Sequence, residues 1–267
     1  MRKTNYHTHT KRCNHAQGSD EEYVLSAIYN GYEELGFSDH SPWKYDSNFV
    51  PKMRMKDNEF DEYYQSILAL KEKYKDQISI KIGLECEYFP KYMDWLKELI
   101  KKYQLDYVIF GNHYYKTDEN QIYFGRRCKD DEMFKLYVDE AIEGMKTGLY
   151  SYLAHPDLFM RAKDEFDDIA KEESYRLCKA AKELDVILEY NLAGAEYNER
   201  VGKCMYPHPE FWKIAASVGN KVIIGVDAHS PDALKTDKYR NEGIRFLTEL
   251  GIEIVDTIPF LNYKDEK

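Results

Sequence analysis

The stretch VIIGVDAH at residues 222–229 decides the fold: it is a short apolar run, rich in β-branched residues, that ends in Asp227 and His229. Such a run is typical of a strand buried on both faces, as in a parallel sheet. Six further runs along the chain have the same character, and segments with a helical period follow them. Strands that alternate with helices predict a parallel sheet covered by helices.

The predicted elements form seven β-then-α units. The strands are Thr4–His7, Glu34–Ser38, Ile78–Leu84, Tyr107–Gly111, Ser151–Ala154, Val186–Tyr190 and Val222–Val226. The helices are Asp20–Tyr29, Glu59–Tyr74, Lys91–Tyr103, Asp130–Lys146, Ile169–Leu184, Pro209–Val218 and Pro231–Leu250. No linker or repeat divides the chain. We therefore expect a single α/β domain over residues 1–267, closed into a barrel rather than left as an open sheet.

Composition excludes several classes of protein. The chain has 267 residues, of which 43% are hydrophobic and 32% charged, as in an ordinary globular protein. A mean hydropathy of −0.70 and the lack of a long apolar run predict no membrane-spanning helix. The first residues lack the apolar region of a secretory signal, and the five cysteines form no CxxC pair, so we expect reduced thiols in a cytoplasm. The net charge of −10 disfavours nucleic acid as a partner.

Histidines gather where the predicted strands end. Seven of the eight lie at the carboxyl end of a strand or just beyond it: His7, His9, His15, His40, His113, His155 and His229. Asp39, Glu85 and Asp227 occupy equivalent places. The carboxyl ends of barrel strands converge on one face, where clustered imidazoles and carboxylates need a cation. This mixture of nitrogen and oxygen ligands favours Zn, Mn or Fe over Ca. His208 lies at a helix start, off this pattern, and we exclude it.

Other features leave alternatives open. The sixth strand has no histidine at its end and offers Glu189 and Asn191 instead. Segment 41–58 has no periodicity and is either a functional lid or a surface insertion. The stretch 251–260 either completes the barrel wall or packs across its bottom. We expect the cysteines next to candidate ligands to be packing residues.

The strand-end motifs resemble the PHP (polymerase and histidinol phosphatase) family. The resemblance rests on His7-Thr-His9-Thr, Gly36-Phe-Ser-Asp39-His40, the strand ends at Glu85 and His113, and Asp227-Ala-His229. Finer features are similar to its monofunctional histidinol-phosphate phosphatase branch: Cys13-Asn-His15, Met53-Arg-Met55, Ala154-His-Pro-Asp157 and Asp227-Ala-His-Ser230.

The resemblance implies a distorted TIM-like (β/α)7 barrel with three divalent transition-metal ions. It implies a first ion held by His7, His9, Glu85 and Asp227. It implies that Glu85 bridges to a second ion, which His113 and His155 also hold. It implies a third ion held by His15, His40 and His229.

The resemblance also implies an activity, the hydrolysis of L-histidinol phosphate to L-histidinol and phosphate in histidine biosynthesis. Our mechanistic hypothesis is that a hydroxide bridging the first two ions attacks phosphorus directly while the third ion grips a phosphate oxygen. The alternative is a PHP phosphoesterase that acts on another small phosphomonoester or a nucleotide. An amidohydrolase-like enzyme or a non-catalytic metal-binding partner fits the motifs less well. The sequence does not indicate an oligomeric state.

Further candidates surround the predicted centre. Arg161 and Arg200 follow strand ends and can fork onto phosphate oxygens, as the similar arginines of the family do. Asp39 either orients His40 from behind or protonates the leaving alkoxide as a general acid, and we take the second as the working hypothesis. For the amine and imidazole of the substrate, the available rim residues are Trp43, Tyr45, Tyr114, Tyr115 and Glu119.

Overall fold

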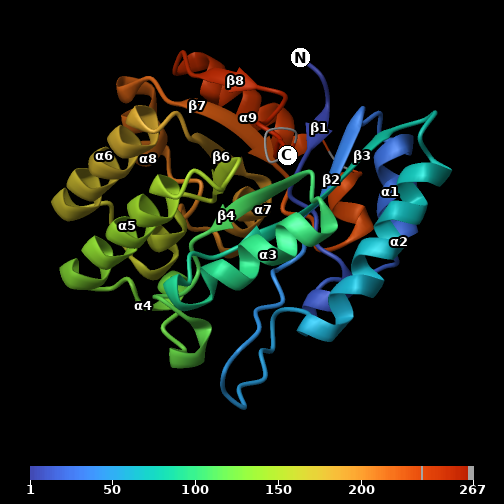
Figure 1. Ribbon diagram of the computed structural model, residues 1–267. Helices are drawn as coiled ribbons and strands as arrows, with labels where there is room; N and C mark the ends of the chain where they lie inside the picture. The colour runs from blue at the N-terminus through green and yellow to red at the C-terminus, as the bar shows by residue number, and fades with distance from the viewer. Residues whose placement is uncertain (236, 264–267) are drawn as a thin grey trace.

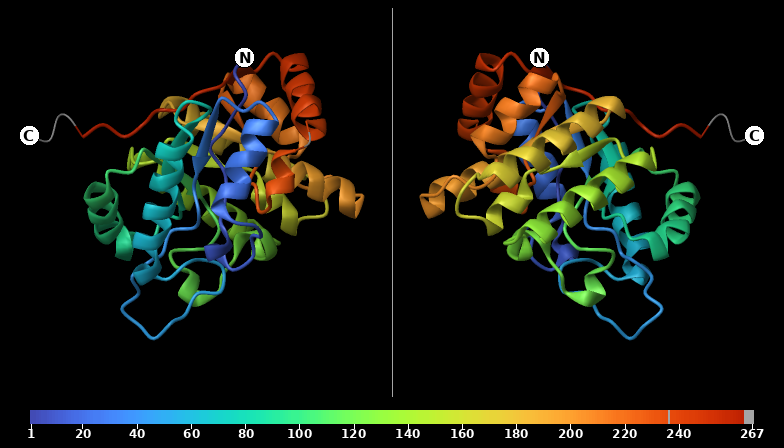
Figure 2. Two further views of the ribbon diagram at one scale, coloured as in Figure 1. Left: turned by 90° about the vertical axis from the view of Figure 1, so that its right-hand side faces the viewer. Right: turned by 90° about the vertical axis from the view of Figure 1, so that its left-hand side faces the viewer.

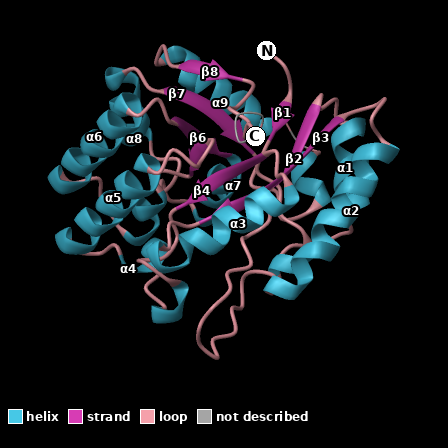
Figure 3. Ribbon diagram, viewed as in Figure 1, coloured by secondary structure: helices cyan, strands magenta, loops and turns pink. Residues whose placement is uncertain are grey.

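The computed structural model describes residues 1–235 and 237–263 and consists of one parallel sheet wrapped by helices (Figures 1 and 3). The strands follow one another in sequence order across the sheet. They are β1 Thr4–Asn5, β2 Glu34–Phe37, β3 Ser79–Cys86, β4 Tyr107–Gly111, β5 Tyr152–Ala154, β6 Ile187–Asn191, β7 Lys221–Gly225 and β8 Glu253–Val255. The predicted parallel α/β architecture is confirmed, with an eighth strand added.

Nine α-helices occur in the described residues. They are α1 Asp20–Tyr29, α2 Phe60–Lys73, α3 Met93–Tyr103, α4 Phe124–Arg127, α5 Asp131–Lys146, α6 Asp168–Glu183, α7 Leu192–Val201, α8 Pro209–Val218 and α9 Lys238–Glu249. Helices α4 and α7 were not predicted from the sequence. The predicted helix Pro231–Leu250 is two elements in the structure, the 3-10 turn Pro231–Leu234 and α9. Helix α7 starts directly after β6 because the Asn191 side chain caps it, accepting a hydrogen bond from the Gly194 amide at 2.8 Å.

The sheet curls until its first and seventh strands meet. Beyond the ends of β1 and β7, Thr8 and Ala228 form a parallel bridge. The His9 amide donates to the Ala228 carbonyl at 2.9 Å, and the Ala228 amide donates to the His7 carbonyl at 3.0 Å. This closure at the carboxyl ends of the strands places the His-Thr-His motif directly beside Asp227.

The sequence left open whether segment 251–260 completes the barrel wall or packs across its bottom, and in the structure it does both. Strand β8 extends the wall by pairing with β7, from Lys221↔Glu253 onward. The chain then crosses the amino end of the barrel, where Ile258 is buried and the Phe260 ring lies 6.0 Å from that of Tyr6. Figure 2 shows this terminal segment leaving the sheet and running past the body of the molecule.

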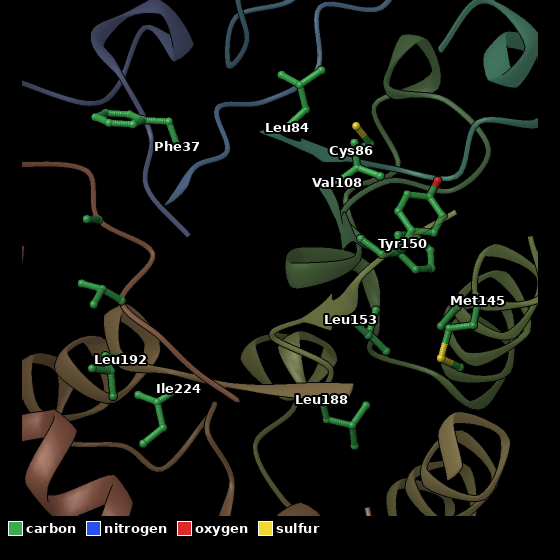
Figure 4. Close-up of a cluster of buried hydrophobic side chains, with 14 of the residues drawn as sticks. Phe37, Leu84, Cys86, Val108, Met145, Tyr150, Leu153, Leu188, Leu192 and Ile224 are labelled. Atoms are coloured by element: carbon green, nitrogen blue, oxygen red, sulfur yellow. The ribbon is translucent and has the colours of Figure 1, made fainter. Parts of the chain in front are cut away.

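The main hydrophobic core lies between the sheet and the helices. Outward-facing strand residues such as Leu84, Cys86 and Leu188 pack there with Met145 and other helix residues (Figure 4). Because side chains alternate along a strand, the neighbours Glu85 and Glu189 face the barrel interior. Segment 41–58 projects beyond the sheet as a long loop (Figure 1). No helix of the described residues has the length and apolarity needed to cross a bilayer.

Candidate metal centre and phosphate site

The nine predicted metal ligands come together at the carboxyl end of the barrel. Eight of them line a cavity of about 610 Å³: His9, His15, His40, Glu85, His113, His155, Asp227 and His229. The ninth, His7, is fully buried and faces the carboxylates of Glu85 and Asp227 from below, at 3.5 and 3.4 Å. The closure of the barrel explains this convergence, because it brings the end of β1 against the end of β7.

Glu85 lies at the centre of the cluster, and imidazoles approach both of its oxygens. His155 Nε2 is 3.0 Å from Oε1, and His113 Nε2 is 3.4 Å from the same atom. On the other side, His40 Nδ1 is 3.0 Å from Oε2. A carboxylate flanked in this way can bridge two cations.

Asp227 and the outer histidines complete the arrangement. Asp227 Oδ1 lies 3.1 Å from His9 Nε2. The Nε2 atoms of His15 and His229 are 3.0 Å apart. Ligand atoms of His15, His40 and His229 all lie within 4.8 Å of one another, which is close enough to share one ion.

The nitrogen and oxygen atoms of these side chains are arranged to bind metal ions rather than to hydrogen-bond with one another. Although several of these atoms lie close together, seven buried ligand atoms have no partner in hydrogen-bonding geometry among the described residues: His7 Nε2, both ring nitrogens of His9, His40 Nδ1, His155 Nδ1, Glu85 Oε2 and Asp227 Oδ1. A buried polar atom without a partner is costly, and native proteins rarely leave several together. The backbone of His155 and Asp227 also has positive φ, of 30° and 54°. Such strain in side-chain-bearing residues is typical of functional sites.

Behind the ligands, Glu189 holds two of them in place. It is fully buried, lies 2.8 Å from His7 Nδ1 and accepts a hydrogen bond from the His155 amide at 3.0 Å. A carboxylate on the far nitrogen of an imidazole fixes its tautomer and orientation. The sequence offered Glu189 as the polar residue of the sixth strand. Because Leu188 faces the outer core, strand alternation predicts that Glu189 faces the barrel interior, where it contacts His7.

A second supporting carboxylate, Glu87, lies behind His113 and was missed entirely. Its Oε1 is 3.1 Å from His113 Nδ1. The buried Arg54 guanidinium donates to both Glu87 oxygens, at 2.7 and 3.0 Å, and to Asp118 at 3.0 Å. Burial alone would raise the pKa of Glu87, but Arg54 and His113 hold it below its usual range. Segment 41–58 is therefore tied to the site through Arg54.

Asp39 lies behind His9 and does not line the cavity. One carboxylate oxygen accepts hydrogen bonds from the Thr10 amide, at 3.2 Å, and from the Thr10 hydroxyl. The other accepts from the His40 amide at 2.8 Å and lies 3.5 Å from His9 Nδ1. Burial tends to raise the pKa of Asp39, yet the neighbouring His9 ring and the Thr10 hydroxyl keep it lowered. An ionised carboxylate aimed away from the cavity suits positioning better than the proton donation of our working hypothesis.

Both predicted phosphate-binding arginines line the cavity. Arg161 belongs to a 3-10 turn after β5, and its Nη1 donates to the Tyr123 hydroxyl at 3.4 Å. Arg200 lies on α7. Within residues 1–235 and 237–263, neither guanidinium forms an ion pair with a carboxylate, so both keep N–H donors that a phosphate can occupy.

The predicted rim is wrong, because none of its five residues lines the cavity. Trp43 is buried and donates to Glu87 at 3.0 Å, and the Tyr45 hydroxyl donates to Asp118 at 2.8 Å. These side chains support the loop from within. The polar and aromatic side chains that line the cavity beyond the ligands and arginines include Tyr123, Glu196, Tyr197, Tyr206 and Tyr239. Most of them lie on α7 or in loops, where no strand period points to them.

His208 and the cysteines, which were not predicted to be ligands, have other contacts in the structure. His208 caps α8 and stacks on Phe166 with ring centroids 4.7 Å apart. Cys13 offers its sulfur within 4.8 Å of a ring nitrogen of both His9 and His229, and burial raises the pKa of its thiol. All five cysteines are free, and Cys86 packs in the outer core.

Comparisons with known proteins agree with this geometry. The family model "PHP domain" matches residues 5–193. A probable histidinol-phosphatase of Deinococcus radiodurans is 29% identical over 240 residues, which is 84% of this chain and 85% of that protein. A probable histidinol-phosphatase of Schizosaccharomyces pombe is 28% identical over 251 residues, covering 84% of this chain and 80% of that one.

A solved structure has the same fold. Histidinol phosphate phosphatase from Lactococcus lactis, complexed with zinc, L-histidinol and phosphate, aligns with a TM-score of 0.73 at 20% identity. The alignment covers 98% of this chain and 99% of that one. The family match spans well over half of the sequence and includes most of the metal-ligand motifs. The chain therefore belongs to the PHP domain family.

Proposed function

We propose that residues 1–267 form one PHP-type domain that hydrolyses L-histidinol phosphate to L-histidinol and phosphate. One observation carries the proposal: among the described residues, buried imidazole and carboxylate atoms without hydrogen-bond partners share a cavity with two arginines that pair with no carboxylate. The first group suits metal ions, and the second suits a phosphate dianion. The names of the relatives, histidinol-phosphatases, supply the substrate.

We assign the ligands to three divalent ions, of Zn, Mn or Fe. The first ion is held by His7, His9, Glu85 and Asp227. The second is held by Glu85, His113 and His155. The third is held by His15, His40 and His229. Ions bound there would supply acidified water and neutralise phosphate charge.

The protein's own side chains orient the reactants around that centre. Arg161 and Arg200 bind phosphate oxygens, since both line the cavity and neither pairs with a carboxylate of the described residues. Asp39 positions His9 rather than meeting the substrate. We therefore expect Asp39→Asn to lower kcat by the same factor for phosphomonoesters with good and poor leaving groups. A loss confined to poor leaving groups would restore Asp39 as the proton donor.

Glu196 is our candidate for the substrate's ammonium group. It is the one carboxylate that lines the cavity in the described chain outside the proposed metal ligands. On α7 it precedes Arg200 by one helical turn, so both side chains project from the same side of the helix. A cationic phosphomonoester can therefore place its phosphate at Arg200 and its ammonium at Glu196.

The test is to purify the protein without chelator, count its metal ions by elemental analysis and measure phosphate release. L-Histidinol phosphate would be compared with p-nitrophenyl phosphate, glycerol phosphate and nucleotides. We expect two to three transition-metal ions per chain, as the ligand groups allow, and the highest kcat/KM for L-histidinol phosphate. A higher kcat/KM for another phosphoester would replace the substrate and keep the chemistry. A protein that binds no metal would contradict both.

A further inference from the structure

Tyr197 contacts both phosphate-site arginines. The Arg161 guanidinium carbon lies 4.9 Å from the centroid of its ring, and that of Arg200 lies 5.1 Å from it. Arg200 follows Tyr197 on α7, whereas Arg161 comes from the turn after β5. A single aromatic ring therefore links two cations from separate elements.

The contact solves a physical problem of the site. Two guanidinium groups in one cavity repel each other, and a carboxylate between them would occupy the donors that phosphate needs. The face of an aromatic ring attracts a cation without accepting its N–H bonds in the guanidinium plane. The Arg161 guanidinium also donates to the Tyr123 hydroxyl at 3.4 Å and interacts with the Tyr197 hydroxyl, and its remaining N–H donors are left for phosphate.

We propose that Tyr197 is a positioning residue, which holds Arg161 and Arg200 over the cavity with their hydrogen-bond donors free for a phosphate dianion. The proposal rests on the assignment of these arginines to phosphate in the proposed function. The proposal does not depend on which alcohol is released when the phosphomonoester is hydrolysed.

A neighbouring hollow shows what the ring prevents. Arg161 and Tyr197 line this hollow as well as the main cavity, so together they form the wall between the two. The hollow also contains the carboxylates of Asp164, Glu165 and Asp167 and the cations of Arg126, Lys129 and Lys163. Asp167 pairs with Lys163 and Asp164 with Lys203, whereas Glu165 forms no ion pair within the described residues. Without the ring, Glu165 is the carboxylate that would draw Arg161 away from the phosphate.

The experiment compares Tyr197→Leu with Tyr197→Phe, since phenylalanine keeps the ring face and leucine removes it. Binding of inorganic phosphate to the metal-loaded proteins would be measured by calorimetry. We expect Tyr197→Leu to raise the Kd roughly tenfold, as the loss of two cation–π contacts implies, and Tyr197→Phe to stay within about twofold. Metal content and affinity for L-histidinol should not change. An unchanged Kd in Tyr197→Leu, or an equal loss in both variants, would overturn the proposal.

Two controls separate this role from a general structural one. Tyr175→Leu removes a tyrosine that is 53% exposed on α6, and it should leave phosphate binding unchanged. In a double-mutant cycle, Arg161→Met should cost less phosphate affinity in the Tyr197→Leu background than in the wild type. Additive losses would contradict the proposal.

The outcome is independent of the proposed substrate. If the protein ignores L-histidinol phosphate but Tyr197→Leu still weakens phosphate binding, the proposed function fails and this inference stands. If the protein hydrolyses L-histidinol phosphate and Tyr197→Leu binds phosphate as the wild type does, the reverse holds.

Discussion

The two ends of the barrel interior are built from the same strands, but they differ in whether their buried polar atoms have hydrogen-bond partners within the protein. At the amino end, Tyr6, Tyr107 and Ile258 fill the space, and the Tyr107 hydroxyl donates to the Tyr6 carbonyl at 2.7 Å. At the carboxyl end, imidazoles and carboxylates face one another, and seven of their buried atoms have no partner. The first end is satisfied by the chain alone, whereas the second is satisfied only when ions are added.

This difference arises because the inward-facing side chains become smaller from the amino to the carboxyl end of a strand. Strand β4 turns Tyr107, Ile109 and Gly111 inward, from the amino to the carboxyl end. A Cβ at Gly111 would lie 2.3 Å from Glu85 Oε1, and one at Gly225 on β7 would lie 1.8 Å from Glu189 Oε1. Large side chains close the amino end, and glycines make room for carboxylates at the other.

The largest effect should come from Glu85→Gln, which removes a carboxylate shared by the proposed first and second ions. We expect metal content to fall and kcat/KM to drop by roughly three orders of magnitude, because the remaining imidazoles lose their common anion. Chelator should lower the unfolding temperature of the wild type more than that of the variant. The matched control is Glu253→Gln, an exposed change on β8 at the amino end. Full metal content in Glu85→Gln would show that Glu85 is not a required ligand and would overturn its proposed bridging role.

A smaller effect should follow from Gly225→Ala, which fills the space beside Glu189. The added methyl forces this carboxylate away from His7 and the His155 amide. We expect metal affinity to fall about 10- to 100-fold, as is usual when a partner behind a ligand is lost. Competition with a chromogenic chelator would measure it.

The double variant Gly225→Ala/Glu189→Asp is the companion test, because a shorter carboxylate relieves the clash. It should recover part of the lost affinity. A double variant that binds metal more weakly than both single variants would show that the glycine matters for another reason.

The same contrast shows how far the sequence could predict the site. The candidate ligands could be found because they lie at strand ends, and the carboxyl ends of parallel strands converge whatever the loops do. This pattern gave ten residues, and the family resemblance separated the nine proposed ligands from Asp39. Glu87 and Arg54 could not, since their contact joins a strand end to a loop without periodicity. Helix α7, with Glu196 and Tyr197, was missed because its apolar pattern is weak and an Asn191 cap starts it. Two of the candidate rim residues, Trp43 and Tyr45 of loop 41–58, do not line the cavity because they fold inward onto Glu87 and Asp118.

Glu196→Gln tests the outer wall of the cavity, which should matter for the substrate and not for the metal. Loss of the carboxylate should raise the KM for L-histidinol phosphate roughly tenfold, since one charge-assisted contact to the ammonium is lost. The KM for p-nitrophenyl phosphate, which carries no amine, is the internal control and should not change. If both substrates were affected equally, Glu196 would serve the site in another way.

Tyr107→Phe should have the smallest effect and tests the satisfied end of the barrel. The Tyr107 side chain is fully buried, and its hydroxyl has a protein partner in the Tyr6 carbonyl. Deleting the hydroxyl should lower the free energy of unfolding by about 1 kcal/mol, the usual value of one buried hydrogen bond. Urea unfolding would show the same loss with and without metal, while metal content and kcat stay at the wild-type values. A loss that depended on metal would mean that the two ends are coupled through strand β4. A loss independent of metal would mean that the amino end contributes its stability alone, without the ions that the carboxyl end requires.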